Sequence, residues 1–221
     1  MTTQMLVRRR PDTSDMVVLH RVFRREFGLA PDLVRAVPDG DVARADYLAG
    51  HLTLLLVGLR HHHAVEDELL WPRLVERATL RADLVHRMQA QHARVAAFTT
   101  GVETLLPLWR NAAREDIRDR LAELLYDLGR ALDGHIAEEE LEVFPLAADY
   151  LSADEWALLG ERSRAGIKRS DMMIFLGAML ENAEPAERLR FVDHLPGPIR
   201  LFWRFVGHRR YERRVARIRA T

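Results

Sequence analysis

One motif occurs twice in this chain of 221 residues, and it constrains the fold more than any other feature. The two copies span residues 62–72 and 135–145 and begin 73 residues apart. Each copy reads His-x-x-x-Glu, then four residues, then an aromatic residue and a proline. Residues four apart share one face of an α-helix, so each copy directs an imidazole and a carboxylate to the same place. The repeat therefore predicts two similar helices that each carry part of one site.

A second pair of histidines repeats with almost the same offset. His20 and His92 lie 72 residues apart, and each precedes one copy of the motif by enough chain for a helix, a turn and part of the next helix. This pattern predicts two helical hairpins that face each other across a pair of metal ions. His20 lies early in its expected helix, whereas His62 and His135 lie late in theirs. In an antiparallel bundle, this placement brings all of them to the same end.

Helical spacing dominates the rest of the chain, and no convincing run of alternating strand residues is present. Long helices with short connections predict an all-α fold, an up-down-up-down four-helix bundle. Prolines are expected to end these helices, because proline lacks the backbone N–H that continues the hydrogen-bond ladder. We expect a connection with one short helical turn over residues 31–38. The four expected helices cover residues 14–28, 42–70, 81–105 and 114–143.

The character of the chain changes after residue 150. Ser152 and Glu155 form a capping-box pattern that predicts a new helix. Further helical segments follow, interrupted by Pro185 and by the prolines near residue 197. We therefore divide the chain into an N-terminal tail at 1–12, a bundle at 13–150 and a C-terminal helical extension at 151–221, which we do not regard as an independent domain.

The composition excludes several kinds of chemistry. The chain has no cysteine, which excludes disulfides and thiolate metal ligands, and its formal net charge is zero, which does not favour nucleic-acid binding. No targeting segment is recognisable, and the longest strongly apolar stretch near the start, residues 52–59, is too short to cross a bilayer. We therefore expect a cytoplasmic protein.

The end of the chain, residues 199–219, mixes eight arginines with four aromatic residues. Such a segment can bind an anionic membrane surface or nucleic acid. Its aromatic side chains can equally pack on the bundle while the arginines extend outward. We favour packing, and we expect neither nucleic acid nor a membrane surface as a partner; a protein partner is left open.

Four imidazoles and two carboxylates are expected to converge in the bundle. Imidazole suits iron, zinc and copper, and a carboxylate can bridge two metals. Without metal, burial of these groups costs several kcal/mol for each charge. Open coordination positions would leave room for a small molecule. The six candidate ligands are His20, His62, Glu66, His92, His135 and Glu139.

These six residues and their spacing resemble the haemerythrin-like, or HHE cation-binding, family over about residues 13–150. The resemblance implies a four-helix bundle with a non-haem di-iron centre, in which two iron ions share an oxo or hydroxo bridge. It also implies that Glu66 and Glu139 bridge the ions and that the four histidines are terminal ligands. Zinc or manganese are possible substitutes for iron.

The chain departs from the oxygen-carrying haemerythrins, which place two histidines four residues apart on the third helix. Here Met88 and Ala96 occupy the positions four residues from His92, so a fifth histidine is missing there. This difference argues against oxygen transport and leaves a position for water or for another side chain, such as Gln89 acting through water. We interpret His61 and His63 as groups outside the ligand set, because each points about 100° away from His62.

Three functions remain open at this stage. The first is a di-iron protein that binds, senses or reacts with a small oxidant or diatomic ligand, such as O₂, NO or H₂O₂. The second is an enzyme that uses the same site for catalase-like peroxide removal or NO handling. The third is a metal-free helical interaction module in which the histidines bind no metal.

Overall fold

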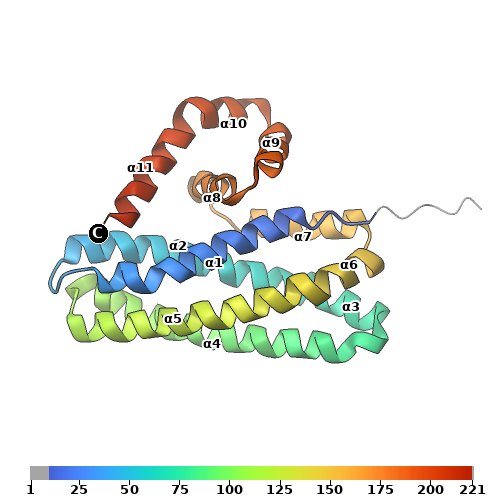
Figure 1. The fold of residues 1–221 in the computed structure, drawn as a ribbon, viewed down its shortest axis with the longest axis horizontal. Helices are drawn as coiled ribbons and strands as arrows, with labels where there is room; N and C mark the ends of the chain where they lie inside the picture. The colour runs from blue at the N-terminus through green and yellow to red at the C-terminus, as the bar shows by residue number, and fades with distance from the viewer. Residues whose placement is uncertain (1–9, 221) are drawn as a thin grey trace, which may run out of the picture.

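Four long antiparallel helices form the body of the protein in the computed structural model (Figure 1). They pack in a ring, since α1 contacts α5, α5 contacts α4, α4 contacts α2, and α2 contacts α1. The structure describes residues 10–220 and contains no strand in that range, which confirms the all-α expectation. Residues 1–9 of the expected tail lie outside the described residues. The four helices are α1 (Ser14–Arg35), α2 (Val42–Leu69), α4 (Ala82–Ala112) and α5 (Glu115–Glu138).

Short helices follow both copies of the motif. The motif prolines lie in the first turn of α3 and of α6, where a missing N–H costs no hydrogen bond. Each proline thus begins a new short helix at the end of the bundle. The short elements are α3 (Trp71–Arg77), the 3₁₀ turn η1 (Thr79–Arg81), the π-helical turn η2 (Glu139–Val143) and α6 (Phe144–Tyr150).

Two of the expected helix ends are wrong. Helix α1 continues through Pro31 to Arg35, and α4 continues through Pro107 to Ala112. A proline inside a helix costs about 3 kcal/mol. The extra turns bury Val34 in α1 and Trp109 in α4, and fully burying one large apolar side chain contributes about 1.5–3 kcal/mol. Packing of these turns therefore offsets the cost of the proline.

Two apolar clusters fill the bundle, one along its body and one at the end closed by α3 and α6. In α1, His20 lies between Met16 of the end cluster and Phe23 of the body cluster. The same order holds in the other three helices, so the polar site residues form one layer between two apolar regions. The segment Val42–Arg77 is long and apolar enough for a membrane span, a property shared by the core helices of globular proteins. We interpret it as a core helix, because it contributes several residues to this buried layer.

The C-terminal segment is helical and packs on one side of the bundle (Figure 1). Helix α7 contacts α2, and α8 contacts α1. Residues 185–219 then form an arch, whose last helix, α11, contacts α8 and α2. The expected capping box is confirmed, since the Ser152 side chain accepts a hydrogen bond from the Glu155 backbone and Glu155 accepts one from Ser152. The elements are α7 (Ala153–Ala165), α8 (Arg169–Asn182), α9 (Pro185–His194), α10 (Gly197–Phe202), the π-helical turn η3 (Trp203–Gly207) and α11 (His208–Arg219).

A buried ion cluster joins the end of the chain to the bundle. Glu26 of α1 accepts a hydrogen bond from His51 of α2 at 2.9 Å and pairs with Arg25 at 2.6 Å. Arg219 of α11 reaches the same carboxylate at 3.4 Å and also pairs with Glu181 of α8 at 2.7 Å. His51 is therefore a core histidine with a hydrogen-bond partner.

We expect Glu26→Gln to make stability less dependent on pH in acid. Burial acts to raise the pKa of Glu26, but the hydrogen bond and charge of His51 and the charge of Arg25 outweigh it and lower the pKa to about 2. Since the folded pKa lies below the ordinary value of 4.5, the contribution to stability is present above pH 4.5 and is lost as pH falls toward 2. It amounts to about 3 kcal/mol at pH 7.

Urea unfolding of metal-free protein between pH 7 and pH 2.5 measures this effect. Glu123→Gln, at an exposed carboxylate of α5, is the matched control and should keep the wild-type pH dependence. If wild type and Glu26→Gln lost stability in parallel as pH falls, the role assigned to this carboxylate would be wrong.

Candidate metal centre

The structure brings all six candidate ligands together in the polar layer of the bundle. They form two groups whose ligand atoms lie within 4.8 Å of one another in each group. All of these residues are at most 7% exposed. No measurement of bound metal tests the ligand assignment, which stays a prediction. The first group is His63, Glu66, His92 and His135, and the second is His20, His62, Glu66 and Glu139.

Two carboxylates connect the groups. Glu66 places Oε1 3.3 Å from His62 Nε2 and Oε2 3.5 Å from His92 Nε2, so its two oxygens face different groups. Glu139 Oε2 lies 3.5 Å from His20 Nε2 and 3.6 Å from His135 Nε2. Each carboxylate therefore stands between imidazoles of both groups. This is the geometry that a bridging carboxylate requires.

His63 belongs to the first group, although we interpreted it from the sequence as a residue outside the ligand set; a ligand role for His63 is a prediction. Its side chain is 7% exposed, and its ring stacks on His92 with centroids 4.0 Å apart. On α2, His62 precedes Glu66 by four residues and His63 precedes it by three, so both lie on the face that carries the carboxylate. The i,i+3 spacing in the sequence is compatible with this position but does not by itself establish it. His63 supplies a fifth imidazole, whereas Gln89, the side chain suggested for that role, is exposed.

Three of the imidazoles are held by hydrogen bonds on their outer nitrogens. His20 Nδ1 lies 3.0 Å from Glu140 Oε1, and His92 Nδ1 lies 2.8 Å from Asp67 Oδ1. His135 Nδ1 lies 3.1 Å from the side-chain oxygen of Gln91. Such contacts fix the ring orientation and leave Nε2 directed inward. Two acidic residues beside the motifs, Asp67 and Glu140, thus orient candidate ligands.

The motif aromatics pack on the histidines that lie outside the motif. Trp71, at the end of the first copy, meets His92 edge-on with centroids 5.5 Å apart. Phe144, at the end of the second copy, stacks on His20 with the same separation of 5.5 Å. Each copy therefore supplies two side chains to the site and one aromatic ring that packs on the histidine of the neighbouring hairpin. This explains why the aromatic residue recurs with the motif.

A π-helical turn follows α5 at Glu139 and spans Glu139–Val143. Such turns insert an extra residue into a helix and are frequent at functional sites. Here two successive carboxylates act on the same centre, since Glu139 faces the interior and Glu140 bonds the outer nitrogen of His20. Glu140 is itself held by Arg24 of α1 at 2.9 Å.

The electrostatics of the cluster favour neutral imidazoles. Burial, reinforced by the neighbouring histidines, lowers the pKa of His62 and of His63 well below the usual value. The same causes lower the pKa of His135 to about 3. A neutral imidazole is the form that binds a metal. These three rings are therefore ready to bind a cation at neutral pH.

The pKa values of the two carboxylates are shifted upward, in contrast to those of the imidazoles. Burial raises the pKa of Glu139, and burial together with the charge of Glu139 raises the pKa of Glu66 well above its usual value. Both oxygens of each carboxylate are buried and have no hydrogen-bond partner among the described residues, and the same is true of Nε2 of His20 and of His63. A buried polar atom without a partner costs about 1–3 kcal/mol, and more when it is charged. One cation in each group would give these atoms a partner, so the donor set fits a metal pair.

The fold and the site define an all-α bundle whose four helices supply a buried, carboxylate-linked cluster for cations. The family model described as Hemerythrin HHE cation binding domain matches residues 12–147. The chain belongs to this family, and the resemblance seen in the sequence is confirmed. No curated protein and no solved structure matched the chain.

Proposed function

We propose that the centre holds two iron ions and binds, senses or reacts with a small oxidant or diatomic ligand such as O₂, NO or H₂O₂. The single observation that carries this proposal is the sharing of Glu66 between two buried groups. An iron pair would supply redox chemistry and Lewis acidity at this point. Imidazole and carboxylate together suit iron, and zinc or manganese are the alternatives.

The protein side chains set the number of open positions. Two octahedral ions offer about twelve coordination positions, and five histidines with two bridging carboxylates fill about nine. About three positions then remain for water or a small ligand. A closed structural site would leave none.

Access to the centre is limited by the packing around it. Every candidate ligand is at most 7% exposed, and apolar clusters lie on both sides of the polar layer. A small neutral molecule can diffuse through such packing during brief fluctuations, whereas a large or charged substrate must first shed its hydration. This favours diatomic gases and peroxide over larger substrates.

An enzyme with the same site is the second candidate, and peroxide distinguishes it from a binder or sensor. We first measure iron per chain and the near-ultraviolet absorption of freshly isolated protein, and expect about two iron ions, the number that two ligand groups hold. Peroxide is then added to the iron-loaded protein. We expect one lasting spectral change without sustained oxygen release.

Oxygen evolution over many turnovers would replace this proposal with catalase-like activity. Full-length protein that takes up neither iron nor zinc nor manganese would instead support the third candidate, a metal-free interaction module. In that case the buried carboxylates would have to be protonated in the folded protein.

A further inference from the structure

The arch of the C-terminal segment has an unpartnered apolar face. Leu201 is 60% exposed, Phe202 42% and Phe205 62%. The spacing of these residues places them on one side of the helix, opposite Trp203 and Gly207, which are buried. The expectation that the tail aromatics pack inward therefore holds for Trp203 but not for the two phenylalanines. Ile199, one turn before Trp203, is a further partly exposed apolar residue at 39%.

Positive charge is concentrated on the same segment. Residues 197–219 contain eight arginines and one acidic residue, Glu212, whereas the whole chain is neutral. This segment thus has a formal charge of +7, and the remainder of the chain has the opposite charge. Such a separation indicates a surface that meets a negatively charged partner.

The arginines nearest the apolar face are available for contact. Arg209, Arg210 and Arg213 form no ion pair with any described residue, and Arg204 lies over the ring of Phe205 at 5.8 Å. Arg209 and Arg213 follow Phe205 by four and eight residues, so they continue its side of the helix. The apolar side chains are therefore flanked by unpaired cations.

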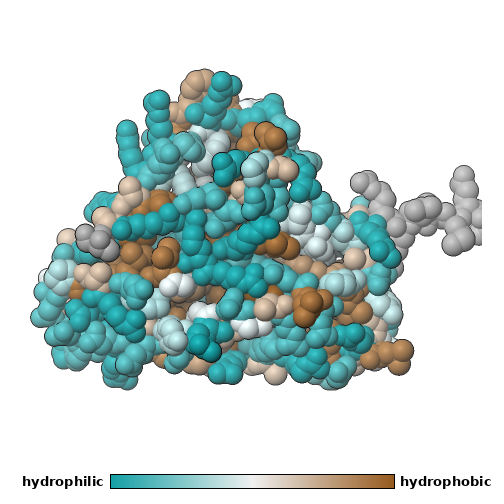
Figure 2. Space-filling model, viewed as in Figure 1, coloured by the Kyte–Doolittle hydropathy of each residue, from teal (hydrophilic) through white to brown (hydrophobic). Residues whose placement is uncertain are grey.

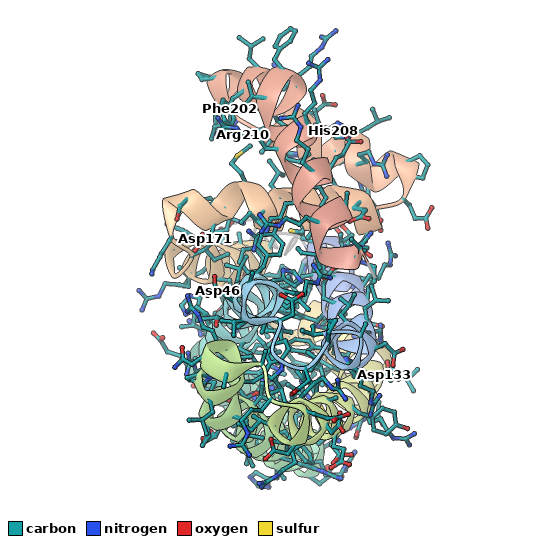
Figure 3. The ribbon with its side chains drawn as sticks, turned by 90° about the vertical axis from the view of Figure 1, so that its left-hand side faces the viewer. Asp46, Asp133, Asp171, Phe202, His208 and Arg210 are labelled. Atoms are coloured by element: carbon teal, nitrogen blue, oxygen red, sulfur yellow. The ribbon has the colours of Figure 1, made fainter. Side chains whose placement is uncertain are left out.

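The arch stands away from the bundle, so a flat surface can reach it. Figure 1 shows α10 at the edge of the molecule furthest from α4 and α5. In Figure 3, Phe202, Arg210 and His208 lie at that same edge. Figure 2 shows hydrophobic residues among hydrophilic ones there.

We propose that this face, formed by Leu201, Phe202, Phe205 and the arginines Arg204, Arg209, Arg210 and Arg213, binds the surface of a membrane containing anionic lipids. Apolar side chains that enter the headgroup region are removed from water, and arginines beside them are attracted to the negative charge of anionic lipid. Leu201, 60% exposed, can insert into lipid but offers no ring for stacking on a base, which favours lipid over nucleic acid. A second copy of the chain would meet the same excess of positive charge, which opposes self-association through this face.

Vesicle co-sedimentation of the full-length, metal-loaded protein tests this proposal. We expect binding to vesicles of mixed phosphatidylglycerol and phosphatidylcholine, and little binding to phosphatidylcholine alone. Binding should weaken at about 0.5 M salt, where charges are screened within a few ångströms. The double substitution Phe202→Ser/Phe205→Ser should weaken binding by about tenfold or more, since it removes two inserting side chains.

Matched controls distinguish binding through this face from binding that depends on exposed apolar or basic residues elsewhere on the surface. Leu80→Ser removes a 95% exposed leucine of η1, outside the proposed face, and should leave binding unchanged. Arg209→Glu/Arg213→Glu should abolish binding, whereas Arg120→Glu/Arg130→Glu, at exposed positions on α5, should reduce it far less. Helical content and iron per chain should match wild type in every variant.

Three results would overturn the proposal. The first is absence of wild-type binding to anionic vesicles, and the second is equal binding by wild type and the double phenylalanine variant. The third is binding of DNA or RNA, or formation of a dimer, that depends on the phenylalanines while vesicles are not bound. Because the readout is vesicle binding, the result is independent of whether the metal centre has the function proposed above.

Discussion

Replacing Glu66 with glutamine is expected to prevent binding of both of the metal ions proposed for this centre. Its two carboxylate oxygens face different groups, at 3.3 Å from His62 and 3.5 Å from His92. An amide has the same shape but no charge, and its nitrogen is a donor rather than a ligand. Loss of a shared anion therefore weakens both ion positions. The two ligand groups hold about two ions per chain in the wild type, and we expect this number to fall to near zero.

Single histidine substitutions should remove metal from one ligand group at a time. His63→Ala removes a ligand from the first group alone, and His20→Ala removes one from the second. We expect each to lose about one ion per chain, since the other group keeps its ligands. His61→Ala is the matched control, because His61 lies on the other side of His62 and contacts the backbone oxygen of Arg162 at 2.9 Å. Elemental analysis after gel filtration measures all of these values.

The result for His63→Ala distinguishes the ligand set seen in the structure, which includes His63, from the set predicted from the sequence, which does not. If His63→Ala kept both ions while His62→Ala lost metal, the ligands would be only the six residues predicted from the sequence. Equal metal content in Glu66→Gln and in wild type would contradict the whole assignment. Glu76→Gln, at an exposed carboxylate of α3, controls for the loss of one negative charge.

Removal of the metal by a chelator is expected to lower the stability of the protein by about 4 kcal/mol or more. This is the stabilisation that a ligand gives at about 1,000 times its dissociation constant. For a chain of this size it corresponds to a fall of about 10 °C in Tm. Without the ions, Glu66 and Glu139 lie at 0% exposure beside unpaired imidazoles. Differential scanning calorimetry of loaded and stripped protein measures the difference.

The double variant Glu66→Gln/Glu139→Gln should reverse part of this loss. Burial raises the pKa of both carboxyls in the fold, so ionising them costs stability, and the cost grows as pH rises from their ordinary range through the raised values. At pH 8 we expect the stripped variant to be about 1–4 kcal/mol more stable than stripped wild type, although it binds no metal. Urea unfolding measures this. A stripped variant less stable than stripped wild type would show that the carboxylates stabilise the fold without metal.

The class of fold and the composition of the site were predictable because they depend on short-range spacing. Residues four apart on a helix share a face in any context, so His62 with Glu66 and His135 with Glu139 could be paired from the chain alone. The layer that contains them could also be placed near one end of the bundle. These inferences required only helix geometry and the alternation of helix direction.

The role of His63 depended on tertiary packing. At three residues from Glu66 it lies on the margin of the same face, and spacing alone leaves such a residue either inside or outside the bundle. Stacking on His92 of α4 holds His63 inside the bundle, and that contact exists only once the two helices are packed. The helix ends at Pro31 and Pro107 were missed for a similar reason, because burial of Val34 and Trp109 outweighs a local preference.

The amino-acid order thus specifies which side chains each helix presents, since that follows from 3.6 residues per turn. Spacing along the chain does not by itself show which atoms of different helices meet within hydrogen-bond distance. The two-faced position of Glu66, the carboxylates that orient His20 and His92, and the exposed phenylalanines of the arch arise from contacts between segments far apart in the chain. Such contacts depend on how whole helices pack, and a pattern of neighbouring residues carries little information about that packing.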